Sequence, residues 1–142
     1  MTDMSKAEVL QKVSEFIDEA GVYTMSTVDG DQPKCRPFRA HYLIDGELYF
    51  GTGRFKDVFR QMQANPKVEI MAFHPADNHF MRFTGEVAFE PDYALAESIL
   101  DAAPAIRKVY TMEGDMKLEM FHLVNAVVEF RNMLKCVERH EL

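Results

Sequence analysis

The chain has 142 residues, of which 47% are hydrophobic and 27% charged, which is the composition of a folded globular protein. At this length a single domain over residues 1–142 is expected, with enough chain to bury a substantial core. The 16 lysines and arginines are outnumbered by 23 aspartates and glutamates, giving a formal net charge of −7. This acidic balance disfavours nucleic acid and anionic membranes as partners, because both bind broad basic surfaces.

Cysteine usage and the first residues of the sequence indicate a reducing, aqueous compartment. Cys35 and Cys136 give neither a disulfide framework nor a zinc-binding spacing. His74 and His79 flank a loop, but no third ligand stands at a suitable spacing, so no metal site is expected. There is no basic stretch followed by an apolar run at residues 1–5, and no segment approaches the ~18 apolar residues of a membrane span. We therefore expect a cytoplasmic protein.

The first predicted element is an amphipathic helix over about residues 5–20. Ser5 and Glu8 have the spacing of a capping box, in which each side chain accepts a hydrogen bond from the other residue's backbone amide. Apolar residues then recur at helical spacing, and Gly21 is a typical terminator. The helix has a single apolar stripe, which must pack against another element.

A pattern of β-branched and aromatic residues then replaces the helical one. It predicts three strands, over 22–28, 34–44 and 47–52, which are separated by Asp-Gly turn signals. We expect these strands to form a three-stranded meander. Pro37 has no amide hydrogen for a sheet ladder, so an edge or a bulge is expected at that position.

Helices and strands alternate in the rest of the chain. A helix is predicted over about 55–64, where Phe55, Val58, Phe59 and Met62 form an apolar face. The other predicted elements are strands at 67–73, 79–89 and 118–130, a helix at 93–102 and a helical turn at 105–110. No structure is predicted for the charged tail from residue 131.

The order of these elements favours the α+β fold class. Runs of strands joined by short turns are typical of an antiparallel sheet, and the helices are inserted between those strands. Six such strands tend to close into a barrel, because closure removes the free edges of the sheet. We therefore expect a six-stranded antiparallel barrel with flanking helices.

The segment richest in chemistry lies where the strand over 47–52 gives way to the next helix. Gly51 and Gly53 flank Thr52 and let a ligand approach the backbone, and the Thr52 hydroxyl can donate a hydrogen bond. Lys56 falls in the first helical turn, where free amides and the helix dipole favour an anion. These features together predict a phosphate site.

Nearby cations strengthen this prediction. Arg36 and Arg39 lie on the adjacent strand, and with Arg54 and Lys56 they form a basic cluster in an acidic protein. A solvated helix start with two cations is the alternative interpretation of the same residues. His41 faces the proposed pocket, either as a neighbour of the ligand or as a hydrogen-bonded structural residue.

A set of motifs spread over residues 21–130 points to a known family. In chain order they are Arg36-Pro37, Tyr49-Phe50-Gly51-Thr52-Gly53, Lys56-Asp57-Val58, Gln61, Ala64-Asn65-Pro66-Lys67-Val68-Glu69, Phe80-Met81-Arg82-Phe83-Thr84-Gly85-Glu86 and Glu119-Met120-Phe121-His122-Leu123. Their order and spacing resemble the pyridoxamine 5′-phosphate oxidase-like, FMN-binding split-barrel family. The resemblance implies a six-stranded split barrel that forms a homodimer and binds FMN between its subunits.

The resemblance also implies a function. A member of this family would be an oxidoreductase that acts on small-molecule electron donors and acceptors, with no nucleic acid or membrane as partner. Carried over position by position, the family pattern gives phosphate-binding roles to Arg36, Thr52 and Lys56, and a cofactor contact to Gln61.

Further residues would surround the flavin ring. The backbone of Pro37, Phe38 and Arg39 would run along the isoalloxazine, and Phe80 would reach the flavin from the partner subunit. No catalytic acid or base emerges from the sequence, which is compatible with a flavin because the cofactor carries the redox chemistry itself.

Two departures from the family pattern favour its branch of general-stress and uncharacterised flavoproteins over the vitamin B6 oxidases. The oxidases carry an Arg-Lys pair after a serine at the helix start, where this chain has Lys56-Asp57-Val58. They also end with a tryptophan and an arginine, whereas this chain has no tryptophan. Two alternatives stay open: a non-catalytic flavin or haem binder with a role in storage or stress, and a dimeric interaction module without a cofactor.

Overall fold

The computed structural model describes residues 3–142 and begins with helix α1, Lys6–Ala20, as predicted. Its capping box is formed: the Glu8 amide donates to Ser5 Oγ at 3.2 Å, and the Ser5 amide donates to Glu8 Oε1 at 3.0 Å. Gly21 ends the helix with φ +83°, a left-handed conformation that favours glycine. The apolar stripe of the helix is buried and consists of Val9, Leu10, Val13 and Ile17.

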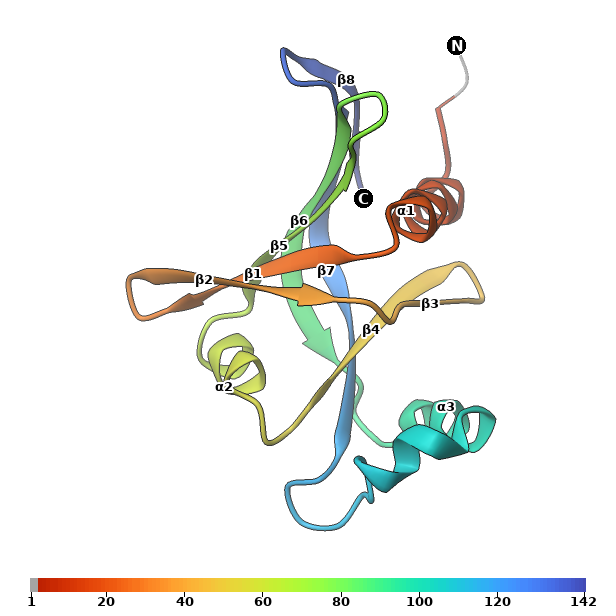
Figure 1. Ribbon diagram of the computed structural model, residues 1–142, viewed down its shortest axis with the longest axis vertical. Helices are drawn as coiled ribbons and strands as arrows, with labels where there is room; N and C mark the ends of the chain where they lie inside the picture. Colours follow the sequence, from red (N-terminus) through yellow and green to blue (C-terminus); the bar gives the residue numbers. More distant parts are fainter. Residues whose placement is uncertain (1–2) are drawn as a thin grey trace.

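Eight strands of the described chain form one antiparallel sheet (Figure 1). In chain order they are β1 Tyr23–Asp29, β2 Gln32–Phe38, β3 Tyr42–Ile44, β4 Glu47–Gly53, β5 Lys67–His74, β6 His79–Phe89, β7 Leu118–Arg131 and β8 Cys136–Glu141. Across the sheet the order is β2-β1-β5-β6-β7-β4-β3, and β8 pairs with β7 outside this path. The α+β class with an antiparallel sheet is therefore confirmed.

Three short helical segments complete the fold. They are α2 Asp57–Ala64, α3 Ala94–Ala102 and the 3-10 helix η1 Pro104–Lys108. Helix α2 contacts β1 and β4, and α3 contacts β7. Helix α1 contacts β3, β4 and β5. No helix within residues 3–142 combines the length and the apolar character needed to cross a membrane.

The single strand predicted over 34–44 is wrong. The chain leaves the sheet after Phe38 and returns at Tyr42, so β2 pairs with β1 while β3 pairs with β4 at the far end of the strand order. The intervening residues bond elsewhere: Tyr23 Oη donates to the Ala40 carbonyl at 2.6 Å, and His41 Nε2 lies 2.9 Å from an Asp18 carboxylate oxygen of α1. Residues 22–52 consequently form two hairpins instead of a meander.

The predicted number of strands is also wrong. Six were expected and eight are present, because the second strand is divided and the charged tail forms β8. The turn before β8 is fixed by Asn132, whose Oδ1 accepts hydrogen bonds from the Leu134 and Lys135 amides. The strand order has two ends, β2 and β3, so the barrel is not closed. Pro37 lies in one of these end strands, as its missing amide hydrogen predicts.

The core has two parts on opposite faces of the barrel wall. The larger part fills the barrel beneath α1, and its largest fully buried aromatic side chains are Tyr23, Phe50, Phe83 and Phe121. The smaller part joins α3 to the start of β7 through Leu100, Leu118 and Met120. Helix α2 lies next to the β1–β2 hairpin (Figure 1), and the candidate site is built at this corner.

Candidate functional site

Arg36 in β2 is the centre of a hydrogen-bonded network that also includes β1 and α2. Its Nη1 donates to Thr27 Oγ1 at 2.7 Å and to the Met25 carbonyl at 3.2 Å. Its Nη2 donates to Gln61 Oε1 at 2.8 Å. Thr27 Oγ1 in turn donates to Gln61 Oε1 at 2.6 Å. The sequence-predicted Arg36 and Gln61 are thus brought together, and Thr27 joins them.

Local periodicity explains how these side chains meet. Met25 is directly opposite Arg36 in the ladder, so Thr27, two residues along β1, is a diagonal neighbour on the same face. That face of β1 is buried, and Thr27 is 2% exposed. Gln61 is 4% exposed and lies on the buried face of α2 beside Met62. Two polar side chains therefore face each other at positions where apolar residues are usual.

Arg36 differs from the other half-buried arginines in having only neutral partners. Arg82, Arg107 and Arg131 each have a carboxylate within 3.3 Å. Within residues 3–142 no carboxylate lies within 4 Å of Arg36. Burial lowers the pKa of the Arg36 guanidinium from its ordinary value, and the more distant Cys35 and Asp57 offset this only in part. An anion at this guanidinium would therefore be favourable.

Thr52, near the end of β4, carries a buried hydroxyl without a partner. The residue is 2% exposed, and its Oγ1 makes no hydrogen bond to any described residue. Buried hydroxyls are normally paired, so the Thr52 hydroxyl could donate to a ligand group that reaches it. The flanking glycines serve packing instead of ligand access: a Cβ at Gly51 would lie 2.8 Å from Met120 Sδ, and one at Gly53 2.6 Å from the Phe55 ring.

Lys56 lies at the start of α2, one residue before the helix. The predicted start at residue 55 is wrong, because the Lys56 amide donates to the Gly53 carbonyl at 3.0 Å and holds residues 53–56 in a turn. Phe55 is consequently outside the helix and 43% exposed. Lys56 is the N-cap residue, and its side chain does not cap the helix. Its ammonium group lies 6.0 Å from the centre of the Phe55 ring and has no carboxylate partner within residues 3–142, at the helix end that favours anions.

Arg54 does not belong to this cluster. Its guanidinium lies 3.7 Å from an Asp115 carboxylate oxygen and 3.8 Å from one of Glu119. It also donates to Tyr93 Oη at 3.3 Å, and Tyr93 donates to Glu119 at 2.6 Å. Burial, and then the bond to Glu119, raises the pKa of Tyr93. The basic cluster expected from the sequence is therefore divided, because Arg54 is neutralised locally.

The residues predicted to line the flavin ring lie along the open edge of β2. Pro37 is exposed, and Arg39 is exposed just beyond the strand. Phe38 is half-buried, with its ring centroid 5.8 Å from that of Tyr23. Because β2 is an end strand, the outer side of its backbone is not taken up by another described strand. This edge begins next to Arg36.

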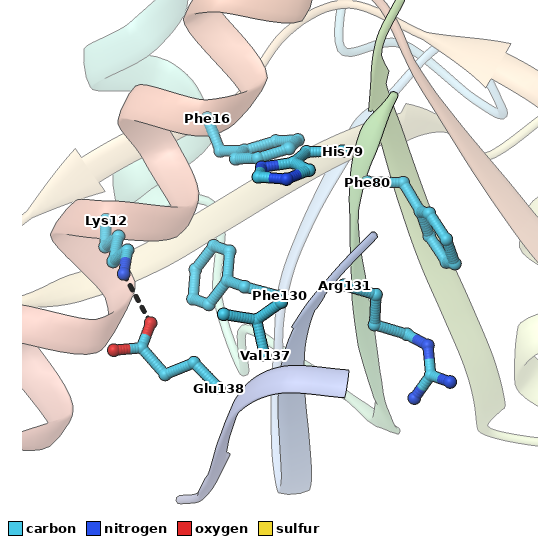
Figure 2. Close-up of a pocket in the computed structure, with 8 residues that line it drawn as sticks. All are labelled: Lys12, Phe16, His79, Phe80, Phe130, Arg131, Val137 and Glu138. Atoms are coloured by element: carbon cyan, nitrogen blue, oxygen red, sulfur yellow. Dashed lines mark hydrogen bonds and ion pairs between the residues drawn. The ribbon is translucent and has the colours of Figure 1, made fainter. Parts of the chain in front are cut away.

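Phe80 lies in a different part of the molecule. Figure 2 shows it at a pocket of about 390 Å³ that is also lined by Phe16 of α1 and Phe130 of β7. The ion-paired Lys12 and Glu138 also line this pocket, and the Lys12 ammonium lies 4.5 Å from the centre of the Phe130 ring.

Strand register gives the separation between Phe80 and the Arg36 network. Ser26, next to Thr27, is opposite Glu69 of β5, whereas Phe80 is opposite Phe73 of the same strand. Four residues of β-strand span about 13 Å. Within one chain, Phe80 is therefore not part of the cluster around Arg36.

The sequence interpretation missed Thr27. Its signal was a polar residue in a strand whose alternate positions, Tyr23 and Met25, are buried and apolar. The partner that satisfies Thr27 lies 34 positions away in the chain, so the pairing could not be inferred from spacing. His41 was assigned two roles and has the structural one, since it bonds to Ser14 and Asp18 of α1.

The strand order, the open side between β2 and β3, and a helix placed against β1 and β4 define a split β-barrel. The family model described as pyridoxamine 5′-phosphate oxidase matches residues 9–130, and the protein belongs to this family. No protein of curated function matches the sequence.

Several solved structures share the fold. A NimC/NimA family protein from Clostridium acetobutylicum is 30% identical over 95% of this chain and 92% of its own, with a TM-score of 0.79. General Stress Protein 26 from Bacillus anthracis is 17% identical over 94% and 98% of the two chains, with a TM-score of 0.70. A haem-binding protein from Mycobacterium smegmatis is 17% identical over 99% of this chain and 60% of its own, with a TM-score of 0.68.

Proposed function

We propose that the protein is a homodimeric flavoprotein that binds FMN and acts as an oxidoreductase on a small molecule. The observation that carries this proposal is the half-buried Arg36 guanidinium, whose hydrogen-bond partners are all neutral. In a chain with an excess of acidic residues, such a cation fits a ligand that brings its own negative charge. The FMN phosphate is such a group, and membership in the pyridoxamine 5′-phosphate oxidase family supports this identification.

The residues around α2 fit a phosphate ester. Arg36 would bind it through its planar fork of N–H donors, which matches two phosphate oxygens. The hydroxyl of Thr52 would gain the partner that it lacks among the described residues. Lys56 would add charge at the start of α2. Among residues 3–142, neither cation has a carboxylate within 4 Å and the Thr52 hydroxyl has no hydrogen-bond partner, whereas Arg54 lies within 3.8 Å of two carboxylates.

Bound FMN would supply the electron-transfer chemistry, and the protein would supply binding and orientation. The backbone of Pro37, Phe38 and Arg39 would line the ring, since this edge of β2 begins next to Arg36. Gln61 would contact the cofactor through its amide nitrogen at most, because its oxygen accepts from Thr27 and Arg36.

A dimer would bring Phe80 of the partner subunit to the flavin. Two features support this arrangement. Phe80 lies beside a pocket instead of in the Arg36 network, and the neighbouring β7–β8 hairpin exposes Met133, Leu134 and Val137. Clustered exposed apolar side chains are typical of surfaces that bind another protein.

An absorption spectrum, recorded before and after adding FMN and desalting, tests the proposal. Flavin bands that persist after desalting are expected. A Soret band in the purified protein would identify haem in place of FMN, and a colourless protein that also fails to retain added FMN would contradict flavin binding. Light scattering at micromolar concentration should give a dimer, and a monomer would contradict the shared site.

Catalysis requires a second measurement. We expect a reduced nicotinamide cofactor to bleach the bound flavin and an added electron acceptor to restore its colour with turnover. Tight binding without turnover would favour the non-catalytic storage or stress role over the oxidoreductase.

A further inference from the structure

We infer that Thr27 is a positioning residue that holds Arg36 for phosphate and makes the site select FMN over riboflavin. The inference rests on the proposed function, since it concerns how that site recognises its ligand. Thr27 itself does not face the ligand, because it is 2% exposed and lies under the guanidinium.

The geometry of the network carries the first step. Thr27 Oγ1 accepts from Arg36 Nη1 and donates to Gln61 Oε1, and that same oxygen accepts from Arg36 Nη2. The three bonds measure 2.7, 2.6 and 2.8 Å and close a triangle that joins β2, β1 and α2. These bonds fix the plane of the guanidinium at both terminal nitrogens, and the bond to Thr27 is the shortest that Nη1 makes, because those to the Met25 and Lys34 carbonyls measure 3.2 and 3.5 Å.

The N–H donors that Arg36 does not use within the network also support the inference. A guanidinium has five N–H donors. Nη1 directs its hydrogens at Thr27, at the Met25 carbonyl and, at 3.5 Å, at the Lys34 carbonyl, and Nη2 uses one hydrogen on Gln61. Nε and the second Nη2 hydrogen have no partner among the described residues. These neighbouring donors form the fork that binds two oxygens of a phosphate.

The burial of the two polar partners carries the third step. Buried polar side chains can often be replaced by apolar ones without loss of stability, so stability alone does not account for a Thr–Gln pair in this position. With an apolar pair, Arg36 would keep only the longer bonds of Nη1 to the Met25 and Lys34 carbonyls, and Nη2 would lose its partner among the described residues. Thr27 therefore acts on the ligand through Arg36.

The test compares FMN with riboflavin, which lacks the phosphate, on the purified apo dimer. Thr27→Val removes the hydroxyl at nearly constant volume, and flavin fluorescence gives both affinities. We expect the FMN affinity to fall about tenfold, the effect typical of losing a hydrogen bond to a charged group, while riboflavin binding is unchanged. Thr27→Ser, which restores the hydroxyl, should recover the preference for FMN.

Two further variants keep the test decisive. Thr24→Val is the matched control: Thr24 is on the same strand, its hydroxyl bonds to the Met71 carbonyl at 3.4 Å, and it lies outside the network. It should leave both affinities unchanged. Gln61→Met removes the other acceptor of the triangle and should reproduce the FMN-specific loss, which covers the case in which Thr27→Val does not fold.

The outcomes separate this inference from the proposed function. An equal loss of both flavins, or no loss of either in the folded variants, overturns the role of Thr27 while leaving FMN binding established. A wild-type protein that binds neither flavin overturns the proposed function and this inference with it. A wild-type preference for FMN that persists unchanged in Thr27→Val and Gln61→Met overturns the inference alone.

Discussion

Two corners of the barrel each contain an arginine, and their surroundings make them opposites. At the β1–β2–α2 corner, Arg36 is bonded to a hydroxyl, an amide oxygen and backbone carbonyls, all of them neutral. At the corner formed by β4, α3 and β7, Arg54 lies within 3.8 Å of the Asp115 and Glu119 carboxylates. Among the described residues, the cation of the first corner has no carboxylate in direct contact, whereas that of the second has two.

An arginine by itself therefore does not make an anion site. Arg36 precedes Pro37 and Arg54 follows Gly53, and both are cations in an acidic chain. What separates them is the charge of the side chains that the fold brings against them. A buried cation gains most from an anion where its existing partners satisfy hydrogen bonds without supplying charge.

The largest expected effect comes from removing the cation of the first corner. Arg36→Ala should weaken FMN binding about 10- to 100-fold, because a charge-assisted hydrogen bond contributes about 1.5–3 kcal/mol. Titration with flavin fluorescence measures this. Arg54→Ala is the matched control and should leave the FMN affinity unchanged. Equal losses in the two variants would show that the corners do not differ in the way described.

Thr52→Val should have the next largest effect, and it should act in opposite directions on binding and stability. FMN affinity is expected to fall about tenfold through loss of a hydroxyl donor. The apo protein should be as stable as wild type or more so, because the variant deletes a buried hydroxyl that has no partner among the described residues. Thermal unfolding with and without FMN measures both. A destabilised apo protein would mean that the hydroxyl already has a structural partner.

The fold could be predicted where its signals are local. The capping box at Ser5 and Glu8 and the alternation in β5 and β6 gave elements close to those observed. The break after Phe38 could not be predicted, because it depends on the Tyr23 hydroxyl and on α1. Strand β8 was missed for a related reason: half of its residues are charged, and its pairing with β7 supplies the structure.

The candidate site was predictable as a set of residue types but not as a geometry. Arg36, Thr52 and Lys56 were named from the sequence, and around α2 the structure has two cations without a carboxylate partner and one unpaired hydroxyl among the described residues. The loss of Arg54 from the cluster depends on Glu119, which is distant in the chain. The inclusion of Thr27 depends equally on a partner in α2. Such pairings are decided by tertiary contacts.

Lys56→Ala should have a smaller effect than either change above. The ammonium group is exposed, so water and salt screen its attraction for a phosphate. We expect FMN affinity to fall about threefold at low ionic strength, which corresponds to the middle of the range for a charge near a helix terminus. The loss should shrink as salt is added. A loss that is independent of salt would indicate a direct, desolvated contact like that proposed for Arg36.

Tyr93→Phe, in the corner around Arg54, should have the smallest effect of these variants, because we expect it to leave the FMN affinity unchanged. This change deletes the 2.6 Å hydrogen bond to Glu119 and should lower the free energy of unfolding by about 1 kcal/mol.

The difference in the free energy of unfolding between wild type and Tyr93→Phe should depend on pH. The pKa of Tyr93 is raised in the folded protein, so its contribution is fully present below the ordinary tyrosine value of 10.0 and is lost as the pH rises through the folded pKa. Denaturant unfolding of wild type and Tyr93→Phe should therefore differ at neutral pH and converge above pH 10. If the variant also weakened FMN binding, the two corners would be coupled, and the Arg54 corner would have to be counted as part of the site.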